Sequence, residues 1–176
     1  MVKIAVFNLL HERDQVKDFD KNSYHLHVPM GATPKDGPSA GTSLFSALVS
    51  SAINRPVAAN LAMTGEITTF GEVISIGGVR EKLTACKNHN ITRVVLPASN
   101  KKNVKKLPDE FKKGFTIYYV QNIRQLYDLA FPEGEMATDQ DLLHQHLTEN
   151  GVQIDQFEED DFYKVVFEGE TIRTNN

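Results

Sequence analysis

Apolar residues recur along the chain at two spacings, one typical of helices and one typical of strands. Residues 2–12 and 38–53 follow the helical spacing, and in the second range Leu44, Leu48 and Ala52 stack on one face. Helices are predicted at 2–12, 38–53, 79–88, 100–106 and 123–130, and strands at 24–28, 57–63, 72–76, 92–96 and 116–120. Because helices and strands alternate, we expect a compact α/β or α+β sandwich in which small mixed sheets pack against helices.

Four residues at the ends or faces of these elements have a specific expected place. Pro38 is predicted at the first position of the second helix, where the N–H that it lacks is not needed. Asn122 is predicted to cap the helix that ends near residue 130. His25 and His27 share one face of the first strand, and we interpret them as solvated or hydrogen-bonded, because no further metal ligand accompanies them at a suitable spacing.

Charge divides the chain into two parts. Residues 1–132 hold 17 Lys and Arg and 11 Asp and Glu, whereas residues 133–176 hold 2 and 12, so a body of net charge +6 precedes an extension of −10. We therefore expect a domain over 1–132 and an acidic C-terminal extension over 133–176, with a short helix near 139–148 and a hairpin at 163–173. The extension is interpreted either as a solvated tail or as a segment that docks on the body or on a partner.

Composition excludes several classes of protein. The chain has 176 residues, of which 40% are apolar, enough for one domain with a hydrophobic core. No apolar stretch approaches the ~20 residues that a membrane helix needs, and no secretory signal is visible. The single cysteine, Cys86, excludes an intramolecular disulfide and zinc sites with several cysteines, and it fits a reducing compartment. We interpret Cys86 as a small core residue and not as a reactive thiol.

The loop before the second predicted helix, residues 31–41, concentrates glycine and proline around one serine. Lys35 among the glycines suggests a phosphate-binding loop, but the spacing of the G-x4-G-K-[ST] motif fails. Residues 37–41 match the G-x-S-x-G motif of a nucleophile elbow, yet a loop and not a strand precedes Ser39. The downstream histidines that would have to complete an elbow's triad are His89, His144 and His146.

A third interpretation makes Ser39 a nucleophile at a helix N-terminus. The N–H groups of a first helical turn are unpaired and the helix dipole adds positive charge there, so both would stabilise an oxyanion. The small neighbours Ala40 and Gly41 leave room for a substrate backbone. The residues alone leave this interpretation open against an ordinary capping serine in a glycine-rich loop.

A nucleophilic serine needs a base, and Lys82 is the candidate. A lysine can serve as a base when burial lowers its pKa, because burial disfavours the ammonium form. Lys82 follows a Gly-Gly turn by one helical turn and has apolar Val79 and Leu83 beside it. The spacing alone favours the alternative of a surface lysine that pairs with Glu81.

Three motifs, in order along the chain, give it a family resemblance. Residues 31–41 (Gly-Ala-Thr-Pro-Lys-Asp-Gly-Pro-Ser-Ala-Gly), 62–67 (Ala-Met-Thr-Gly-Glu-Ile) and 76–83 (Ile-Gly-Gly-Val-Arg-Glu-Lys-Leu) strongly resemble the proteolytic domain of the ATP-dependent Lon proteases. The likeness covers roughly residues 2–132, including His-Leu-His-Val-Pro at 25–29 and Val-Val-Leu-Pro at 94–97. The resemblance implies the compact α/β fold of that domain.

The resemblance also implies roles for single residues. Ser39 matches the nucleophile and Lys82 the base of a Ser-Lys dyad, and Thr64 matches the threonine that orients the lysine. Asp36 matches an aspartate that gates the site by holding Lys82 charged, since a charged lysine cannot accept the serine proton. The supporting residues beside the nucleophile are Gly37, Pro38 and Ala40. No metal site is implied.

The implied function is that of a serine endopeptidase that hydrolyses internal peptide bonds of unfolded proteins through an acyl-enzyme. The sequence has no Walker motif, so we expect no cofactor in this chain and expect ATP and Mg²⁺ to act only through a separate ATPase module. The family's strands before the first helix have no match here, and they help to bind substrate along a sheet edge. The alternative is therefore a weak or idle Lon-like domain that serves assembly or regulation.

The expected partners and compartment follow from the same resemblance. They are an unfolded polypeptide substrate, a separate ATPase and further copies of the chain, because the family assembles as hexamers. We interpret the lysines at 101, 102, 105 and 106 as a solvated helix face and expect no nucleic-acid or membrane partner. The expected compartment is the cytoplasm, or the mitochondrial matrix for a piece of an organellar enzyme.

Overall fold

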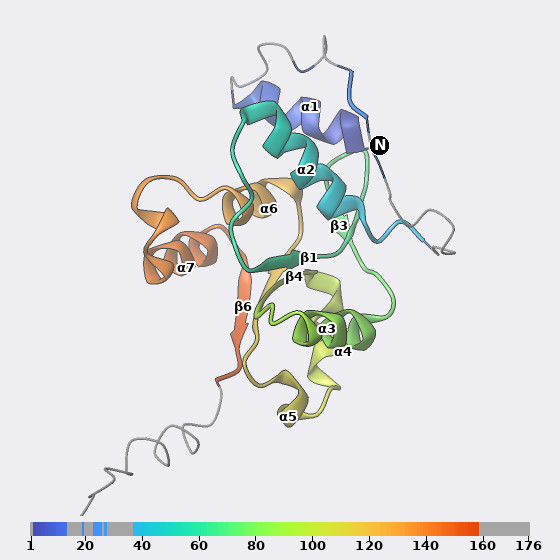
Figure 1. The fold of residues 1–176 in the computed structure, drawn as a ribbon, viewed down its shortest axis with the longest axis vertical. Helices are drawn as coiled ribbons and strands as arrows, with labels where there is room; N and C mark the ends of the chain where they lie inside the picture. Colours follow the sequence, from blue (N-terminus) through green and yellow to red (C-terminus); the bar gives the residue numbers. More distant parts are fainter. Residues whose placement is uncertain (1, 14–18, 20–22, 26, 28–36, 159–176) are drawn as a thin grey trace, which may run out of the picture.

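A four-stranded sheet forms the centre of the molecule (Figure 1). The computed structural model describes residues 2–13, 19, 23–25, 27 and 37–158. The strands are β1 (Leu61–Met63), β2 (Glu66–Ile67), β3 (Val73–Ile74), β4 (Arg93–Pro97), β5 (Thr116–Val120) and β6 (Gln153–Gln156). Within the central sheet the order is β1-β4-β5-β6, with β1, β4 and β5 parallel and β6 antiparallel to β5. A separate antiparallel pair is formed by β2 and β3.

Helices cover both faces of this sheet. They are α1 (Val2–Glu12), α2 (Gly41–Ile53), α3 (Val79–Asn88), α4 (Lys101–Lys105), α5 (Asp109–Lys112), α6 (Ile123–Ala130) and α7 (Gln140–Glu149), with short 3₁₀ turns η2 (Ala98–Asn100) and η3 (Gly134–Ala137). Figure 1 shows α1, α2 and α6 on one side of the strands and α3 and α4 on the other. The architecture confirms the predicted compact α/β sandwich with small mixed sheets.

The alternation of side chains along the strands produces one core on each face of the sheet. Val95 and Tyr118 belong to the core under α1, α2 and α6, whereas Val94 and Ile117 belong to the core under α3 and α4. All four side chains are buried, so these strands carry apolar residues on both faces, as parallel strands between helices do.

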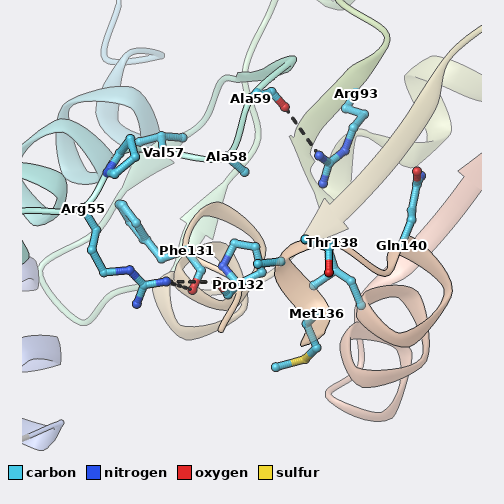
Figure 2. Close-up of a pocket in the computed structure, with 13 residues that line it drawn as sticks. Arg55, Val57, Ala58, Ala59, Arg93, Phe131, Pro132, Met136, Thr138 and Gln140 are labelled. Carbon is cyan, nitrogen blue, oxygen red and sulfur yellow. Dashed lines mark hydrogen bonds between the residues drawn. The ribbon is translucent and has the colours of Figure 1, made fainter. Parts of the chain in front are cut away.

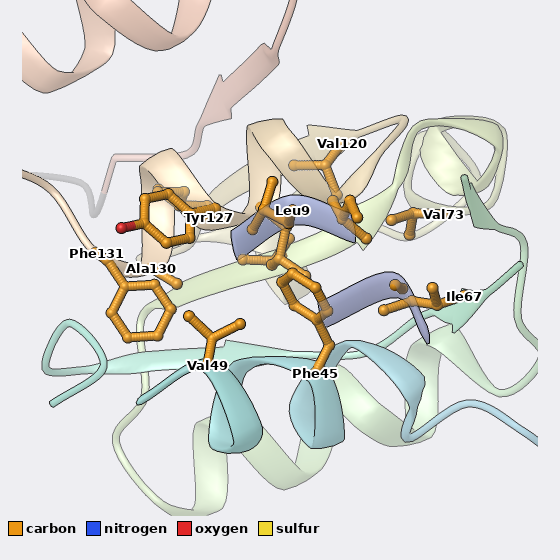
Figure 3. Packing of buried hydrophobic residues seen from close by; sticks show 14 of the residues in the cluster. Leu9, Phe45, Val49, Ile67, Val73, Val120, Tyr127, Ala130 and Phe131 are labelled. Atoms are coloured by element: carbon orange, nitrogen blue, oxygen red, sulfur yellow. The ribbon is translucent and has the colours of Figure 1, made fainter. Parts of the chain in front are cut away.

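The first core positions the segments that lead to the candidate site (Figure 3). Leu9 of α1, Phe45 of α2 and Tyr127 of α6 meet in it, and Ile67 and Val73 bring in β2 and β3. Each of these side chains is at most a few per cent exposed. Burial of such a side chain stabilises the fold by about 1.5–3 kcal/mol, so α2 and the β2–β3 pair are held firmly together.

Most of the predicted elements exist, but several begin or end elsewhere. The helices predicted at 2–12 and 79–88 and the strand at 116–120 have the predicted bounds. Pro38 as the first helical residue is wrong: α2 begins at Gly41, because Pro38 instead lies in a turn closed by its carbonyl and the N–H of Gly41, at 3.1 Å. The predicted cap is confirmed, since the Asn122 side chain accepts the N–H groups of Arg124 and Gln125.

The predicted strands of the first half of the chain are shorter than expected. The strand predicted at 57–63 is confined to Leu61–Met63, and that at 72–76 to Val73–Ile74. Tyr24, His25 and His27 have no regular secondary structure, and residues 26 and 28 lie outside the described residues. Within the part of the chain that the structure describes, no helix is long and apolar enough to cross a membrane.

The described part of the extension packs against the body. The short helix predicted near 139–148 is α7, with Asp139 as its cap, and its Leu143 and Leu147 are buried in the first core. Strand β6 adds to β5, where Asp155 accepts the Tyr119 hydroxyl and pairs with Lys101, both at 2.9 Å. The hairpin predicted at 163–173 lies outside the described residues.

Candidate active site

Ser39 lies in the turn that leads into α2, and its hydroxyl has no hydrogen-bond partner among the described residues. The capping position of α2 belongs to Ala40, and no side chain of the described residues caps this helix. The Ser39 side chain is half-buried, and it makes no hydrogen bond to any other described residue. Ser39 is therefore not the ordinary capping serine that its loop allowed.

The backbone of Ser39, in contrast, is held firmly. Its carbonyl oxygen accepts the Thr64 hydroxyl and the Gly65 N–H, each at 3.0 Å. The Gly65 carbonyl in turn accepts the Thr42 N–H at 3.1 Å, so the segment after β1 is bonded to both sides of the turn. The serine is thus fixed through its main chain while its side chain stays available.

Two glycines allow this close approach of α2 to the segment after β1. A Cβ on Gly41 would lie 2.9 Å from both the Gly65 carbonyl oxygen and the Ile67 nitrogen, which are backbone atoms. A Cβ on Gly65 would lie 2.8 Å from side-chain carbons of Thr42 and Val73. Both distances are shorter than a real Cβ contact, so each position requires glycine.

Lys82 lies one turn into α3 and turns back toward the start of that helix. Gly78 caps α3 with φ of +66°, and the ammonium of Lys82 donates to the Gly77 carbonyl at 3.1 Å. The lysine is half-buried, whereas Arg80 and Glu81 are exposed. No carboxylate of the described residues lies within ion-pair distance of Lys82, so the alternative of a lysine paired with Glu81 is not what the structure contains.

Ser39 and Lys82 line the same pocket. Its volume is about 320 Å³, and its walls come from the turn before α2, from β2 and from the loop and first turn of α3. The lining residues are Gly37, Pro38, Ser39, Glu66, Ser75, Ile76, Gly77, Gly78 and Lys82. A hydroxyl and an amine in one cavity are the two groups that a Ser-Lys dyad requires.

A buried asparagine that the sequence did not indicate supports one wall of this pocket. Asn100 is 1% exposed, and its side chain bonds both the N–H and the carbonyl of Ile76, at 3.0 and 2.9 Å. These two bonds fix the segment after β3, directly before the Gly-Gly turn that precedes Lys82. Glu66 and Ser75 are further lining residues that were not singled out, although Glu66 lies within one of the recognised motifs.

The remaining predicted site residues have different outcomes. Gly37 and Pro38 line the pocket, whereas Ala40 is exposed beside it at the helix cap. Asp36 lies outside the described residues. The resemblance implies that Thr64 orients Lys82. In this structure the Thr64 hydroxyl donates to the Ser39 carbonyl.

The nucleophile-elbow alternative is not supported by the structure. No histidine lines the pocket in the described part of the chain, and His144 instead bonds the Tyr118 hydroxyl at 2.9 Å.

Cys86 is 8% exposed and faces the second core. Burial raises the pKa of its thiol, and a hydrogen bond with its own backbone has a smaller effect in the opposite direction. Its predicted place as a core residue is confirmed.

Comparison with known proteins identifies the family. Residues 5–133 match the Lon protease (S16) C-terminal proteolytic domain. The chain is 47% identical over 125 residues to the mitochondrial Lon protease homolog of Bos taurus, which is 70% of this chain and 13% of that protein. It is also 47% identical over 113 residues to Lon protease 1 of Syntrophotalea carbinolica, covering 64% of this chain and 14% of that protein. A third relative, the Lon protease of Buchnera aphidicola, is 49% identical over 115 residues, or 65% and 15%.

Proposed function

The chain belongs to the Lon protease family through its proteolytic domain, and on this premise we propose that it is a serine endopeptidase in which Ser39 is the nucleophile and Lys82 the general base. The observation that carries the proposal is the shared pocket, in which the serine hydroxyl is unbonded and the lysine has no carboxylate partner among the described residues. The chain covers 13–15% of the length of these relatives. That it shares their protease activity is therefore part of the same proposal.

The proposed reaction has two balanced halves. In the first, the Ser39 oxygen attacks the peptide carbonyl, Lys82 takes the hydroxyl proton, and the same proton then passes to the leaving amine as the acyl-enzyme forms. In the second half, water attacks the ester carbon, Lys82 takes a proton from it and returns that proton to the Ser39 oxygen. The products are the amine released in the first half and a carboxylic acid, which gives up its proton to water to become a carboxylate, and both residues end in their starting states.

The start of α2 supports this reaction electrostatically. Among the described residues, the N–H groups of Ser39 and Ala40 have no backbone acceptor, and we propose that they bind the developing oxyanion. The dipole of a 13-residue helix adds partial positive charge at the same end. The Gly77 carbonyl holds the Lys82 amine within the pocket, where it can exchange its proton.

We further infer the kind of substrate and partner. An unstructured polypeptide can bring an extended segment into a pocket of this size without first unfolding, so we take it as the substrate class. Because the sequence contains no Walker motif, an ATPase module outside this sequence would supply unfolding, and ATP and Mg²⁺ would bind there. Further copies of the chain would assemble with that module, in a reducing compartment such as the cytoplasm or the mitochondrial matrix.

Hydrolysis of an unstructured protein tests the proposal. The wild-type chain, Ser39→Ala, Lys82→Ala and the control variants Ser51→Ala and Lys105→Ala, all at exposed or half-buried sites, would be incubated with fluorescently labelled casein. We expect loss of at least about 100-fold in both pocket variants, because each removes a group essential to proton transfer or attack. The two controls should keep the wild-type rate.

Two outcomes would count against the proposal. Wild-type activity that persists in Ser39→Ala would refute Ser39 as the nucleophile. No hydrolysis by any variant, with circular dichroism showing an intact fold, would favour the alternative of a Lon-like module that serves assembly or regulation.

A further inference from the structure

A second cavity lies at the junction of the body and the extension, and it shares no residue with the Ser39 pocket (Figure 2). Its volume is about 590 Å³. The body contributes the segment 55–59, Arg93 and the end of α6, and the extension contributes residues between Met136 and Leu143. The part from the extension lies beyond the residues that match the family domain.

The walls of this cavity are mainly apolar. Val57, Phe131, Met136 and Leu143 face it from three different segments of the chain. A volume within roughly 300–1,000 Å³ and apolar walls with a few polar groups are typical of sites for small organic molecules. The polar groups therefore decide which molecule fits.

One of the two arginines in the cavity is already neutralised. Arg55 pairs with Glu133 at 2.9 Å. Its second nitrogen donates to the carbonyls of Phe131 and Pro132, at 3.2 and 3.0 Å. Arg55 thus ties the end of α6 to the loop before β1 and has little capacity left for a ligand.

Arg93, the other arginine, lies 5.7 Å from the centroid of the Tyr118 ring, but no described carboxylate neutralises it. Its Nε donates to the Tyr118 hydroxyl at 3.3 Å and its Nη1 to the Ala59 carbonyl at 3.4 Å, both long bonds. Its Nη2 is buried without any hydrogen-bond partner. Among the described residues, no carboxylate lies within ion-pair distance of this guanidinium.

The charge of Arg93 is also felt by its neighbour. Burial lowers the pKa of His144, and the positive charge of Arg93 lowers it further, against an opposite effect of Asp141. Figure 2 shows the guanidinium between Ala59 and the Thr138–Gln140 side of the cavity. A partly buried cation with an unpaired donor is costly, and an anion in the cavity would offset that cost.

We propose that this cavity binds a monocarboxylate that carries a short apolar group. The carboxylate would accept hydrogen bonds from Nη1 and Nη2 of Arg93, because the guanidinium fork matches the two carboxylate oxygens. One unpaired cation fits one negative charge, and the apolar group would lie against Val57 and Met136. Since Nη2 is out of contact with solvent, the guanidinium shifts on binding, which its two long bonds permit.

Two sources supply this chemistry, a free aliphatic carboxylic acid and the C-terminal residue of a peptide. In either case the ligand touches both the body and the extension, so binding stabilises the docked extension. Octanoate represents the first source and N-acetyl-leucine the second. Octanol and N-acetyl-leucinamide have similar apolar groups without the charge.

Isothermal titration calorimetry of the full chain with these four compounds tests the proposal. We expect binding of at least one carboxylate and at least tenfold weaker binding of its uncharged partner. The carboxylate of higher affinity identifies the source. Arg93→Gln and Ala137→Trp, the latter placing a large side chain at an exposed lining position, should each weaken binding at least tenfold. Arg124→Gln, which removes an exposed arginine paired with Glu12, should leave it unchanged.

Three results would overturn the proposal. They are octanoate and N-acetyl-leucine binding no better than their uncharged partners, wild-type affinity in Arg93→Gln, and no binding of either carboxylate at millimolar concentration. Ala137→Trp keeps Arg93 intact, so it decides the question if Arg93→Gln does not fold.

Discussion

At the scale of single residues, Ser39 combines a fixed main chain with an unbonded side chain. Its carbonyl accepts two hydrogen bonds from Thr64 and Gly65, while its hydroxyl accepts and donates none among the described residues. A nucleophile held in this way needs little rearrangement before attack, and such positioning accounts for a large share of enzymatic rate acceleration. For Ser39 as the proposed nucleophile, we therefore propose Thr64 as a positioning residue.

Substitution of Thr64 tests that role. Thr64→Val keeps the shape of the 9%-exposed side chain but removes the bond to the Ser39 carbonyl. We expect a roughly tenfold fall in kcat, because the serine loses one of its two anchors, and a loss of about 1 kcal/mol in the free energy of unfolding.

Thr64→Ser is the matched control, because it restores the hydroxyl. Both quantities should return toward wild type in steady-state kinetics and urea unfolding. A Thr64→Val variant with unchanged kcat and lowered stability would show that the residue only supports the fold.

The sequence motifs predicted four of the site residues that line the pocket, but they did not single out Glu66 or Ser75 and did not show how the lining residues are bonded. Ser39 and Lys82 lie 43 positions apart, and the motifs alone indicated that they share one site. The bond from Thr64 to Ser39 and the support of Ile76 by Asn100 were not predictable, because both depend on how three loops pack together. A short polar side chain in a loop gives no signal of its partner.

At the scale of elements, the site depends on the contact between α2 and the segment that runs from β1 into β2. The backbones approach so closely at Gly41 that a Cβ there would lie 2.9 Å from two backbone atoms. Periodicity predicted the body of α2 but placed its start at Pro38. The sequence does not show that the Pro38 carbonyl accepts the Gly41 N–H and closes a turn before the helix. Strand β6 was missed for a related reason: its four residues are mostly polar, and pairing with β5 makes them a strand.

Gly41→Ala should therefore destabilise the protein. We expect a loss of about 1–3 kcal/mol in the free energy of unfolding, measured with urea, because the new methyl group would push α2 away from β2. The Ser39 pocket would widen as α2 moves, so kcat should also fall.

Gly77→Ala is the comparison for Gly41→Ala, since a Cβ at Gly77 meets no atom within 4 Å. Its stability should stay close to that of the wild type. Equal stability of the two variants would mean that the contact at Gly41 relaxes without cost.

At the scale of the whole molecule, the described part of the extension belongs to the folded unit. It contributes α7 to the first core and β6 to the sheet, although the sequence left a solvated tail and a docked segment as alternatives. Charge alone could not decide between them, because the buried apolar residues of α7, Leu143 and Leu147, are few and lie within an acidic stretch. The bond between His144 and Tyr118 lies at the junction.

This junction should weaken in acid. Because the pKa of His144 is lowered in the folded state, mainly by burial and then by Arg93, the unfolded chain takes up the proton more readily. The stability that neutral His144 supports is present above its ordinary pKa and is lost as the pH falls below it. Wild type should lose more free energy of unfolding between pH 7 and pH 5 than His144→Gln, which can still bond Tyr118 but does not titrate. Parallel urea curves at these pH values provide the measurement, and equal losses would contradict the expectation.

The claim that Lys82 activates Ser39 is tested most directly by covalent labelling of the serine. A fluorophosphonate reacts with an activated serine oxygen and releases fluoride, so it requires neither an ATPase nor a polypeptide substrate. Mass spectrometry of the digested chain should find the adduct on Ser39, formed at least about 100-fold more slowly in Lys82→Ala and absent in Ser39→Ala. Labelling of Ser39 at the same rate in wild type and Lys82→Ala, or labelling only at another serine, would contradict the account.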